Sequence, residues 1–353
     1  MDEVVDEAQQ TVSRGARELI CRLNQAATSF QKAAANVQRA AQLVLSKEQV
    51  RQVVEAEGQA VQQAQAAGAL RPTWKAEDCV VEGTDATRMY VGLDGVQVPV
   101  ITEEEKQQRR RKILEKRRRR GRKCRPLPRA KRGADGAYKE FRVVAFYDQT
   151  NEHAHVAALQ GNHTAAGQLL AREARRLELH RADEKIANVD GAPWIRNELE
   201  LHGVVDHIGL DFYHLSQHVE EARRAVYGEA SEAGRRWVQD VMHAFKHEGY
   251  AAARKQLQEW KRTLSRKQQK AAQKLLGYLT PRREMIRYPE CLARGWQIGS
   301  GPTEAQCRTT TARLKGSSRR WDVDNAQAVM ALACLENSNA WDEYWFAPTP
   351  PPT

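Results

Sequence analysis

The chain has 353 residues, a formal net charge of +11 and 41% hydrophobic residues. This apolar content is enough for a folded core, which excludes a wholly disordered chain. The longest apolar runs are far shorter than the ~18 residues that a membrane-spanning helix needs, so we expect no membrane partner. The first ten residues are acidic and lack the apolar segment of a secretory signal, and the six cysteines are scattered without a Cys-x-x-Cys pair. We therefore expect a cytoplasmic protein without a disulfide framework.

Residues 1–80 read as a helical N-terminal region, because Gly and Pro are scarce and apolar residues recur every three to four positions. One helix is expected over about 27–43. Another begins at Ser46, because Ser46 and Gln49 have the spacing of a capping box. Two helices joined by a short turn are compatible with a helix-turn-helix that binds DNA ends, and equally with a hairpin used for packing or dimerisation.

The rest of the chain, 81–346, alternates predicted strands with predicted helices, which indicates an α/β domain with a mixed sheet. Strands are expected over 89–100 and 138–148, a helix over 163–179, a strand over 184–190, and a strand that turns into a helix over 202–219. Helices then continue to about residue 280, and a further helix starts at Thr303. A last apolar helix is expected over about 322–346, and the Pro-rich tail 347–353 should be disordered.

The segment 106–133 contains sixteen Lys and Arg residues and one acid, Glu115, which gives it a net charge of +15 and leaves about −4 for the other 325 residues. Self-repulsion within this segment opposes compact folding unless a polyanion is present. Phosphates are the natural neutralisers, since each contact also releases condensed counterions. The segment therefore predicts contact with nucleic acid. The alternative is a solvated loop without a binding function.

Two aspartates, Asp94 and Asp190, each lie where a predicted strand meets a glycine. Carboxylates at the ends of neighbouring strands share one edge of a sheet, where they repel each other unless a cation lies between them. Mg²⁺ suits such a site, because it takes one or two carboxylates and completes its shell with water and phosphate oxygens. Glu304, in the first turn of a late helix, could complete a pair of metal sites. The alternative is that each Asp-Gly pair is only a turn.

These residues belong to strings that resemble the DDE transposases of bacterial insertion sequences, in particular the ISKra-type group, whose layout is similar to that of Mutator-like elements. The strings are VGLDG (91–95), NVDGAPWI (188–195), DFYH (211–214), WQIGSGPTEAQCR (296–308), RLKGSSRRW (313–321) and WDEYW (341–345). The resemblance covers about 88–346. It is specific in its combination of motifs, whereas each motif alone is not.

The resemblance implies an RNase H-like mixed sheet with a large all-helical insertion at about 214–290, in addition to the helical N-terminal region. It implies that Asp94, Asp190 and Glu304 are the catalytic and metal-binding triad, holding two Mg²⁺ ions for which Mn²⁺ can substitute. Asp211 and His214 match an accessory Asp-x-x-His motif. The implied activity is cleavage at transposon ends in double-stranded DNA followed by strand transfer into target DNA, by a homodimer or higher oligomer associated with the nucleoid.

Several basic residues are expected to bind DNA around this triad. Arg308 lies four residues after Glu304, on the same side of the predicted helix. The expected DNA-binding residues are Arg308, Arg313, Lys315, Arg319, Arg320, Trp321, Arg117, Arg118, Arg119 and Arg120. Trp321, and less so Trp194, could stack on unpaired bases, although such aromatic residues are more often part of the core.

Other assignments remain open from the sequence. Asp211 is the main rival for the second catalytic acid, and Asp148 is a distant third that is expected to be a turn residue. His153 and His155 resemble a metal pair but lack a third ligand nearby, so we expect them at the surface. The alternative functions are a stand-alone RNase H-like nuclease, or a truncated or repurposed DNA-binding relic without catalysis.

Overall fold

A five-stranded mixed sheet forms the centre of the protein in this computed structural model, which describes residues 12–121, 124–316 and 319–346. The strands are β1 (Arg88–Pro99), β2 (Tyr138–Tyr147), β3 (Ala154–Gln160), β4 (Glu184–Val189) and β5 (His207–Leu210). Their order across the sheet is β3-β2-β1-β4-β5. The first three are antiparallel neighbours, whereas β4 runs parallel to β1 and β5 runs parallel to β4. The expected α/β class with a mixed sheet is confirmed.

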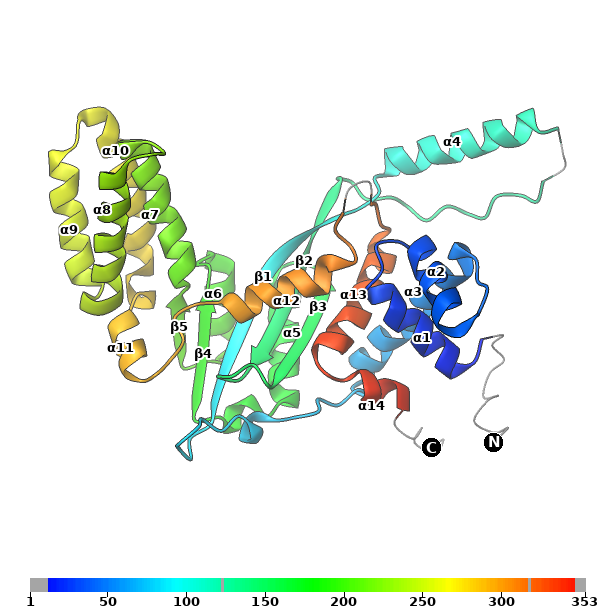
Figure 1. Cartoon of the computed structure of the whole chain (residues 1–353), viewed down its shortest axis with the longest axis horizontal. Helices are drawn as coiled ribbons and strands as arrows, with labels where there is room; N and C mark the ends of the chain where they lie inside the picture. Colours follow the sequence, from blue (N-terminus) through cyan, green and yellow to red (C-terminus); the bar gives the residue numbers. More distant parts are fainter. Residues whose placement is uncertain (1–11, 122–123, 317–318, 347–353) are drawn as a thin grey trace.

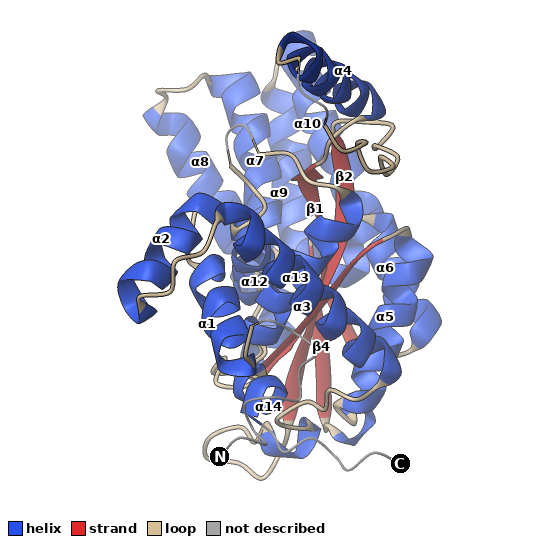
Figure 2. Cartoon of the chain, turned by 90° about the vertical axis from the view of Figure 1, so that its right-hand side faces the viewer, coloured by secondary structure: helices blue, strands red, loops and turns tan. Residues whose placement is uncertain are grey.

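Helices cover both faces of this sheet (Figure 2). The helices α5 (His163–Arg176) and α6 (Pro193–His202) pack on the face to which Met89, Val91 and Leu93 contribute. The opposite face is covered by α12 (Gly301–Ala312), α13 (Val323–Asn337) and α14 (Trp341–Phe346). The alternation of β1 side chains between two apolar cores explains why this strand is buried on both faces over most of its length.

The N-terminal helices extend the second of these cores. They are α1 (Arg14–Gln25), α2 (Phe30–Ala41) and α3 (Lys47–Ala67). The predicted capping box at Ser46 is confirmed, with Gln49 returning the bond. A Cβ atom at Gly58 of α3 would lie 2.2 Å from the Ala328 carbonyl oxygen of α13, so the two helices cross in close backbone contact. The N-terminal region is therefore packed into the core on this face of the sheet, and its role as a helix-turn-helix stays a prediction.

The expected helical stretch after β5 forms a bundle at one end of the sheet (Figure 1). Its helices are α7 (Phe212–Tyr227), α8 (Glu232–His243), α9 (Tyr250–Thr263), α10 (Arg266–Leu279) and α11 (Tyr288–Ala293), with a π-helical turn at Ala244–Glu248 and a 3₁₀ turn at Thr280–Met285. Buried Trp237 and Trp260 stack with ring centroids 4.2 Å apart at its centre. The bundle lies between β5 and α12, which is where the resemblance implied an insertion.

The basic segment contains a helix that the sequence analysis did not predict. Helix α4 (Glu103–Arg119) begins at a Thr102–Glu105 capping box, has no buried residue and projects from the body as an arm (Figure 1). Arg110 and Arg117 donate to carbonyl oxygens of the irregular segment 124–133 that runs back along it, and Lys106 pairs with Asp322 at the base. The first-turn acids and the last-turn cations suit the helix dipole, so local propensity outweighs self-repulsion.

Strand β3 and helix α6 were not predicted from the sequence. The expectation of a single tail helix was wrong, because a turn in which Asn339 has φ of +52° divides it into α13 and α14. The prediction that 347–353 is disordered lies outside the described residues. No helix in the part of the chain that the structure describes is long and apolar enough to span a membrane.

Candidate active site

The two predicted catalytic aspartates lie near each other on neighbouring parallel strands. The ladder between β1 and β4 ends with Tyr90 beside Ile186. The same offset, carried four residues further along each chain, would bring Asp94 level with Asp190, and the Asp190 charge does raise the pKa of Asp94. Side chains alternate along β1, so Asp94 shares the face of Tyr90, where Cys307 of α12 contacts it.

Asp211 extends this alignment to a third strand. The β4–β5 ladder ends with Val189 beside Leu210, so Asp190 and Asp211 follow as the next residues of neighbouring parallel strands. Burial raises the pKa of Tyr278 to about 12, Arg282 opposes the rise, and the charges of Asp190 and Asp211 add to it. Both aspartates are therefore within electrostatic reach of the same phenol. The carboxyl ends of β4 and β5 and the middle of β1 together carry a row of three acids.

The electrostatics of Asp94 reflect this crowding. Burial raises the pKa of the Asp94 carboxyl, the Gly95 N–H opposes the rise with a 2.6 Å hydrogen bond, and the Asp190 charge adds to it. Contact with the Cys307 thiol and the positive field of His214 lower the Asp94 pKa by smaller amounts. Asp94 thus lies among the groups that the motifs predicted, and its anionic form is destabilised in the absence of a cation.

The turn after Asp190 is held from the helical bundle. The Asp190 Oδ1 atom accepts a 2.7 Å hydrogen bond from the Ala192 N–H, and Gly191 has φ of +81°, which favours glycine. The guanidinium of Arg282 donates twice to the Gly191 carbonyl oxygen, at 3.0 and 2.8 Å, and the Tyr278 hydroxyl donates to the Asp190 carbonyl oxygen at 3.3 Å. The bundle therefore fixes the backbone of the second acid.

Asp211 has a different role from Asp190. Its side chain is 2% exposed, Oδ1 accepts from the His214 N–H at 2.7 Å, and Oδ2 accepts from the Ser300 N–H. Both carboxylate oxygens are thus committed to backbone donors, one at the start of α7 and the other immediately before α12. The geometry favours Asp190 over Asp211 as the second metal ligand and makes Asp211 the residue that positions the start of α12.

The loop before α12 crosses the carboxyl edge of the sheet. The Gln297 N–H donates to the Tyr90 hydroxyl oxygen at 2.9 Å, and Asn188 Nδ2 donates to the Gln297 carbonyl oxygen at 2.8 Å. The Phe212 N–H donates to the Ile298 carbonyl oxygen at 3.0 Å. These bonds connect the loop to β1, β4 and the start of α7, so α12 begins above the row of acids.

Glu304 lies in the first turn of α12. A Cβ atom at Gly92 would lie 2.0 Å from Thr303 Oγ1, so α12 packs directly on β1, and one turn later Cys307 contacts Asp94. Glu304 lies between these two contacts along the helix and is exposed. Among the described residues, Glu304 is not one of the groups that shift the pKa of Asp94, and no three His, Cys, Asp or Glu side chains form a ready metal site.

Two residues predicted to bind DNA are buried instead. Trp321 is 7% exposed, packs edge-on against Phe30 and donates to the Leu314 carbonyl oxygen at 3.0 Å, so its ring belongs to the core. Arg313 is 4% exposed and donates to Asn24 Oδ1. No local pattern could have shown this, because Phe30 and Asn24 are almost 300 residues away in the sequence.

The other predicted basic residues are partly or fully exposed. Arg308 and Lys315 are exposed along and just after α12, and Arg118, Arg119 and Arg120 are exposed on the arm. Arg319 donates to the carbonyl oxygen of Ala312, the last residue of α12, and to those of Arg313 and Lys315 just after it. Arg117 donates a hydrogen bond to the Arg125 carbonyl oxygen, and Arg320 approaches Glu105 at 3.8 Å.

The remaining candidates have structural partners. Asp148 is buried and accepts from Thr150, and one of its oxygens lies 3.0 Å from His153 Nδ1. The expectation of a surface His pair was wrong for His155, whose Nε2 lies 3.0 Å from an oxygen of buried Glu173. Half-buried Trp194 stacks under the guanidinium of Arg142 at 4.1 Å.

Comparison with models of known protein families gives no match, and comparison with curated proteins gives no significant sequence match. Assignment of function therefore depends on the geometry of the site.

The site also contains residues that sequence reasoning missed. Thr303, Cys307 and Ser300 make the contacts that seat α12 on β1 and Asp211. Thr303 and Cys307 lie one turn apart on the predicted helix and therefore share a face, which could have indicated that both contact the sheet. Tyr278 and Arg282 come from the bundle and carried no local signal.

Proposed function

We propose that this protein is a DDE-type transposase, a metal-dependent polynucleotidyl transferase with an RNase H-like catalytic domain. The strand order β3-β2-β1-β4-β5, with three antiparallel strands followed by two parallel ones, supports this fold. The helical bundle between β5 and α12 supports the proposed insertion between the second acid and the glutamate.

The observation that carries the proposal is the proximity of Asp94, on β1, to Asp190, at the end of the neighbouring parallel strand β4, with Cys307 of α12 in contact with Asp94. These two acids are 96 positions apart in the chain. Isolated turns or caps give no reason for two remote acids to lie so close together, and we propose that Glu304, in the first turn of α12, is the third acid.

The residues present fit divalent cations. The pKa of Asp94 is raised by burial and by the Asp190 charge, which a cation between the two carboxylates would offset. Each aspartate uses Oδ1 for a backbone N–H, and Asp94 also contacts the Cys307 thiol, which a metal ion at Asp94 would have as a neighbour. Asp94 and Asp190 would hold one Mg²⁺, and Asp94 with Glu304 a second.

The chemistry is in-line displacement at phosphorus, for which the bound ions supply activation of water and stabilisation of the leaving oxygen. The protein's own residues orient the carboxylates. Gly95 and Ala192 fix the two aspartates through backbone N–H groups, and Asp211 fixes the start of α12 and with it Glu304. Basic residues on α12 and the arm would bind the backbone of double-stranded DNA.

The test is the variant Asp190→Asn, with Asp240→Asn as the matched control because Asp240 is exposed on α8. We expect Asp190→Asn to keep DNA binding and to abolish Mg²⁺-dependent cleavage of a duplex that carries the DNA flanking the gene, whereas the control keeps both. Cleavage by Asp190→Asn would refute the assignment. Joining of the cut 3′ end to a second duplex separates a transposase from a stand-alone nuclease, and wild-type protein that binds DNA without nicking it would be a non-catalytic relic.

A further inference from the structure

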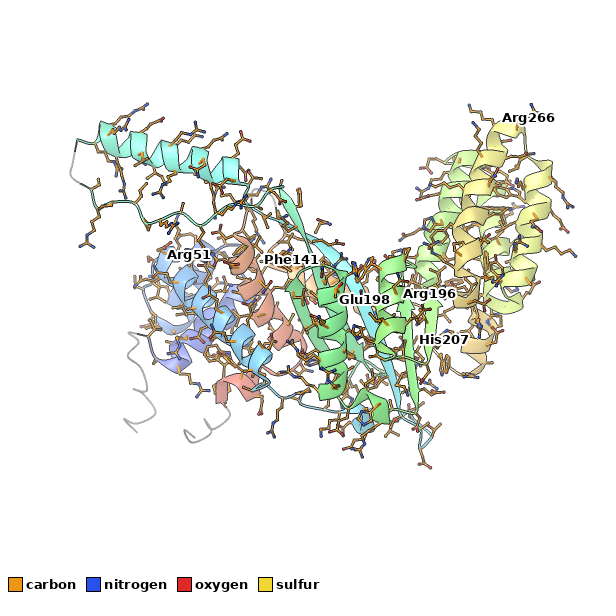
Figure 3. All side chains as sticks on the ribbon, turned by 180° about the vertical axis from the view of Figure 1, so that it is seen from behind. Arg51, Phe141, Arg196, Glu198, His207 and Arg266 are labelled. Carbon is orange, nitrogen blue, oxygen red and sulfur yellow. The ribbon has the colours of Figure 1, made fainter. Side chains whose placement is uncertain are left out.

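A pocket of about 340 Å³ lies apart from the row of acids, where the N-terminal helices meet the segment after α12 and the base of the arm. In Figure 3, the labelled Arg51 marks its α3 side, below the arm. Five arginines line it, from α3, α4 and the segment 313–320, against two carboxylates, Glu55 and Asp322. The lining also includes Phe30 and Trp321, so the pocket combines positive charge with aromatic faces.

Arg313 is one of the residues that line this pocket, and it is 4% exposed. Its guanidinium Nε and Nη2 donate to Asn24 Oδ1, both at 3.2 Å, and it lies over the rings of Phe30 at 4.7 Å and Trp321 at 5.3 Å. Burial lowers the pKa of Arg313 to about 10, and repulsion by Arg319 contributes. In the described ranges of the chain no carboxylate pairs with it. A neutral amide and two rings only partly offset the cost of burying such a charge.

The two acids of the pocket do not supply the missing charge. Glu55 pairs with Arg51 of the same helix, and Asp322 pairs with Lys106 at the base of the arm. Among the described residues, Arg313 and Arg319 have no carboxylate partner, whereas Arg320 approaches Glu105 at 3.8 Å. Helix α2 begins at Phe30, so the positive end of its dipole adds to the field.

We propose that this pocket binds one phosphate group of the DNA backbone, an inference that rests on the proposed function for its choice of ligand. Guanidinium groups bind phosphate oxygens through paired, charge-assisted hydrogen bonds, and such bonds are strong when partly buried. Arg109 of α4 also lines the pocket, so DNA that follows the basic arm passes over it. A phosphate here would bridge the N-terminal helices to the segment that leaves α12, and would offset the buried charge of Arg313.

Inorganic pyrophosphate in EDTA is the probe, titrated calorimetrically at constant ionic strength. The variants are Arg320→Ala and Arg109→Ala in the pocket, and the matched control is Arg118→Ala, which removes the same charge from the exposed part of α4. We expect each pocket variant to bind pyrophosphate at least about tenfold more weakly, as the loss of a hydrogen bond to a charged group implies, and the control to stay within twofold. Unchanged melting temperatures without pyrophosphate show that each variant is folded.

Pyrophosphate should also weaken binding of duplex DNA to the wild type more than sodium chloride of equal ionic strength does, and this excess should vanish in Arg320→Ala. Equal weakening of pyrophosphate binding by Arg118→Ala would overturn the pocket, because the effect would then come from diffuse charge. Pyrophosphate binding without competition against DNA would overturn the backbone assignment and indicate a site for a free anion. The experiment contains no metal and no cleavage, so failure of the proposed catalysis leaves its result intact.

Discussion

The contact between α12 and β1 should control catalysis more than stability, and Gly92→Ala tests this. The new methyl carbon would lie 2.0 Å from Thr303 Oγ1 and 2.6 Å from its Cγ2, whereas ordinary contact begins at 3.4 Å. Relief therefore needs a shift of about 1.4 Å between helix and strand, and it moves Glu304 relative to Asp94.

Overpacking of this kind lowers the free energy of unfolding by about 1–3 kcal/mol. For a chain of 353 residues this lowers the melting temperature by only about 1–4 °C. A misplacement of about 1 Å in an active site can cost about 100-fold in rate. We therefore expect cleavage to fall about 100-fold at a temperature where the variant remains folded, with DNA binding unchanged.

The assay is Mg²⁺-dependent cleavage beside thermal unfolding, with Gly277→Ala as control because a Cβ atom there meets nothing within 4 Å. Adding Thr303→Ala to Gly92→Ala removes the two nearest atoms and should restore part of the activity. If Gly92→Ala cleaves DNA within threefold of the wild type, the reasoning that α12 positions Glu304 through this contact is refuted.

Three further predictions concern other parts of the molecule. The pKa of Asp94 in the folded protein is raised from 3.8, so ionisation of this carboxyl lowers the stability of the folded state as the pH rises through the folded-state pKa. Asp94→Asn should therefore melt at a higher temperature than the wild type at pH 7 in EDTA and lose this advantage near pH 3. An equal difference in melting temperature at both pH values would contradict the shift. Gly58→Ala should lose about 1–3 kcal/mol in urea unfolding, because the new methyl meets the Ala328 carbonyl oxygen at 2.2 Å; unchanged stability would place α3 farther from α13. Replacing Arg117–Arg120 with glutamine should reduce the slope of log affinity for DNA against log salt concentration by up to about 3.6. The melting temperature should not change, because α4 has no buried residue. An unchanged slope would exclude the arm from DNA contact.

Local patterns were sufficient for most of the sheet and for two of the acids. The strand around Asp94 could be predicted from its β-rich composition, and the capping box at Ser46 from a spacing of three residues. Strand β3 escaped prediction because Ala154–Gln160 contains three alanines and two polar residues, a composition that favours no strand, and it is fixed by pairing with β2.

Long-range packing decided the rest. The sequence showed Trp321 and Arg313 as members of a basic, aromatic motif, but their burial depends on Phe30 and Asn24 in the N-terminal helices. Asp211 could not be distinguished from Asp190 by motif, because the difference is that Asp211 receives the Ser300 N–H from a loop 89 residues away. The basic arm was expected to resist folding because repulsion was weighed above capping and helix propensity.

The central claim is that Asp94, Asp190 and Glu304 converge on divalent cations, and anomalous diffraction from crystals of the protein with Mn²⁺ and duplex DNA tests it most directly. The account predicts anomalous peaks between these three carboxylates, absent in crystals of Asp190→Asn. Ordered Mn²⁺ bound elsewhere, with no peak between Asp94 and Asp190, would contradict it.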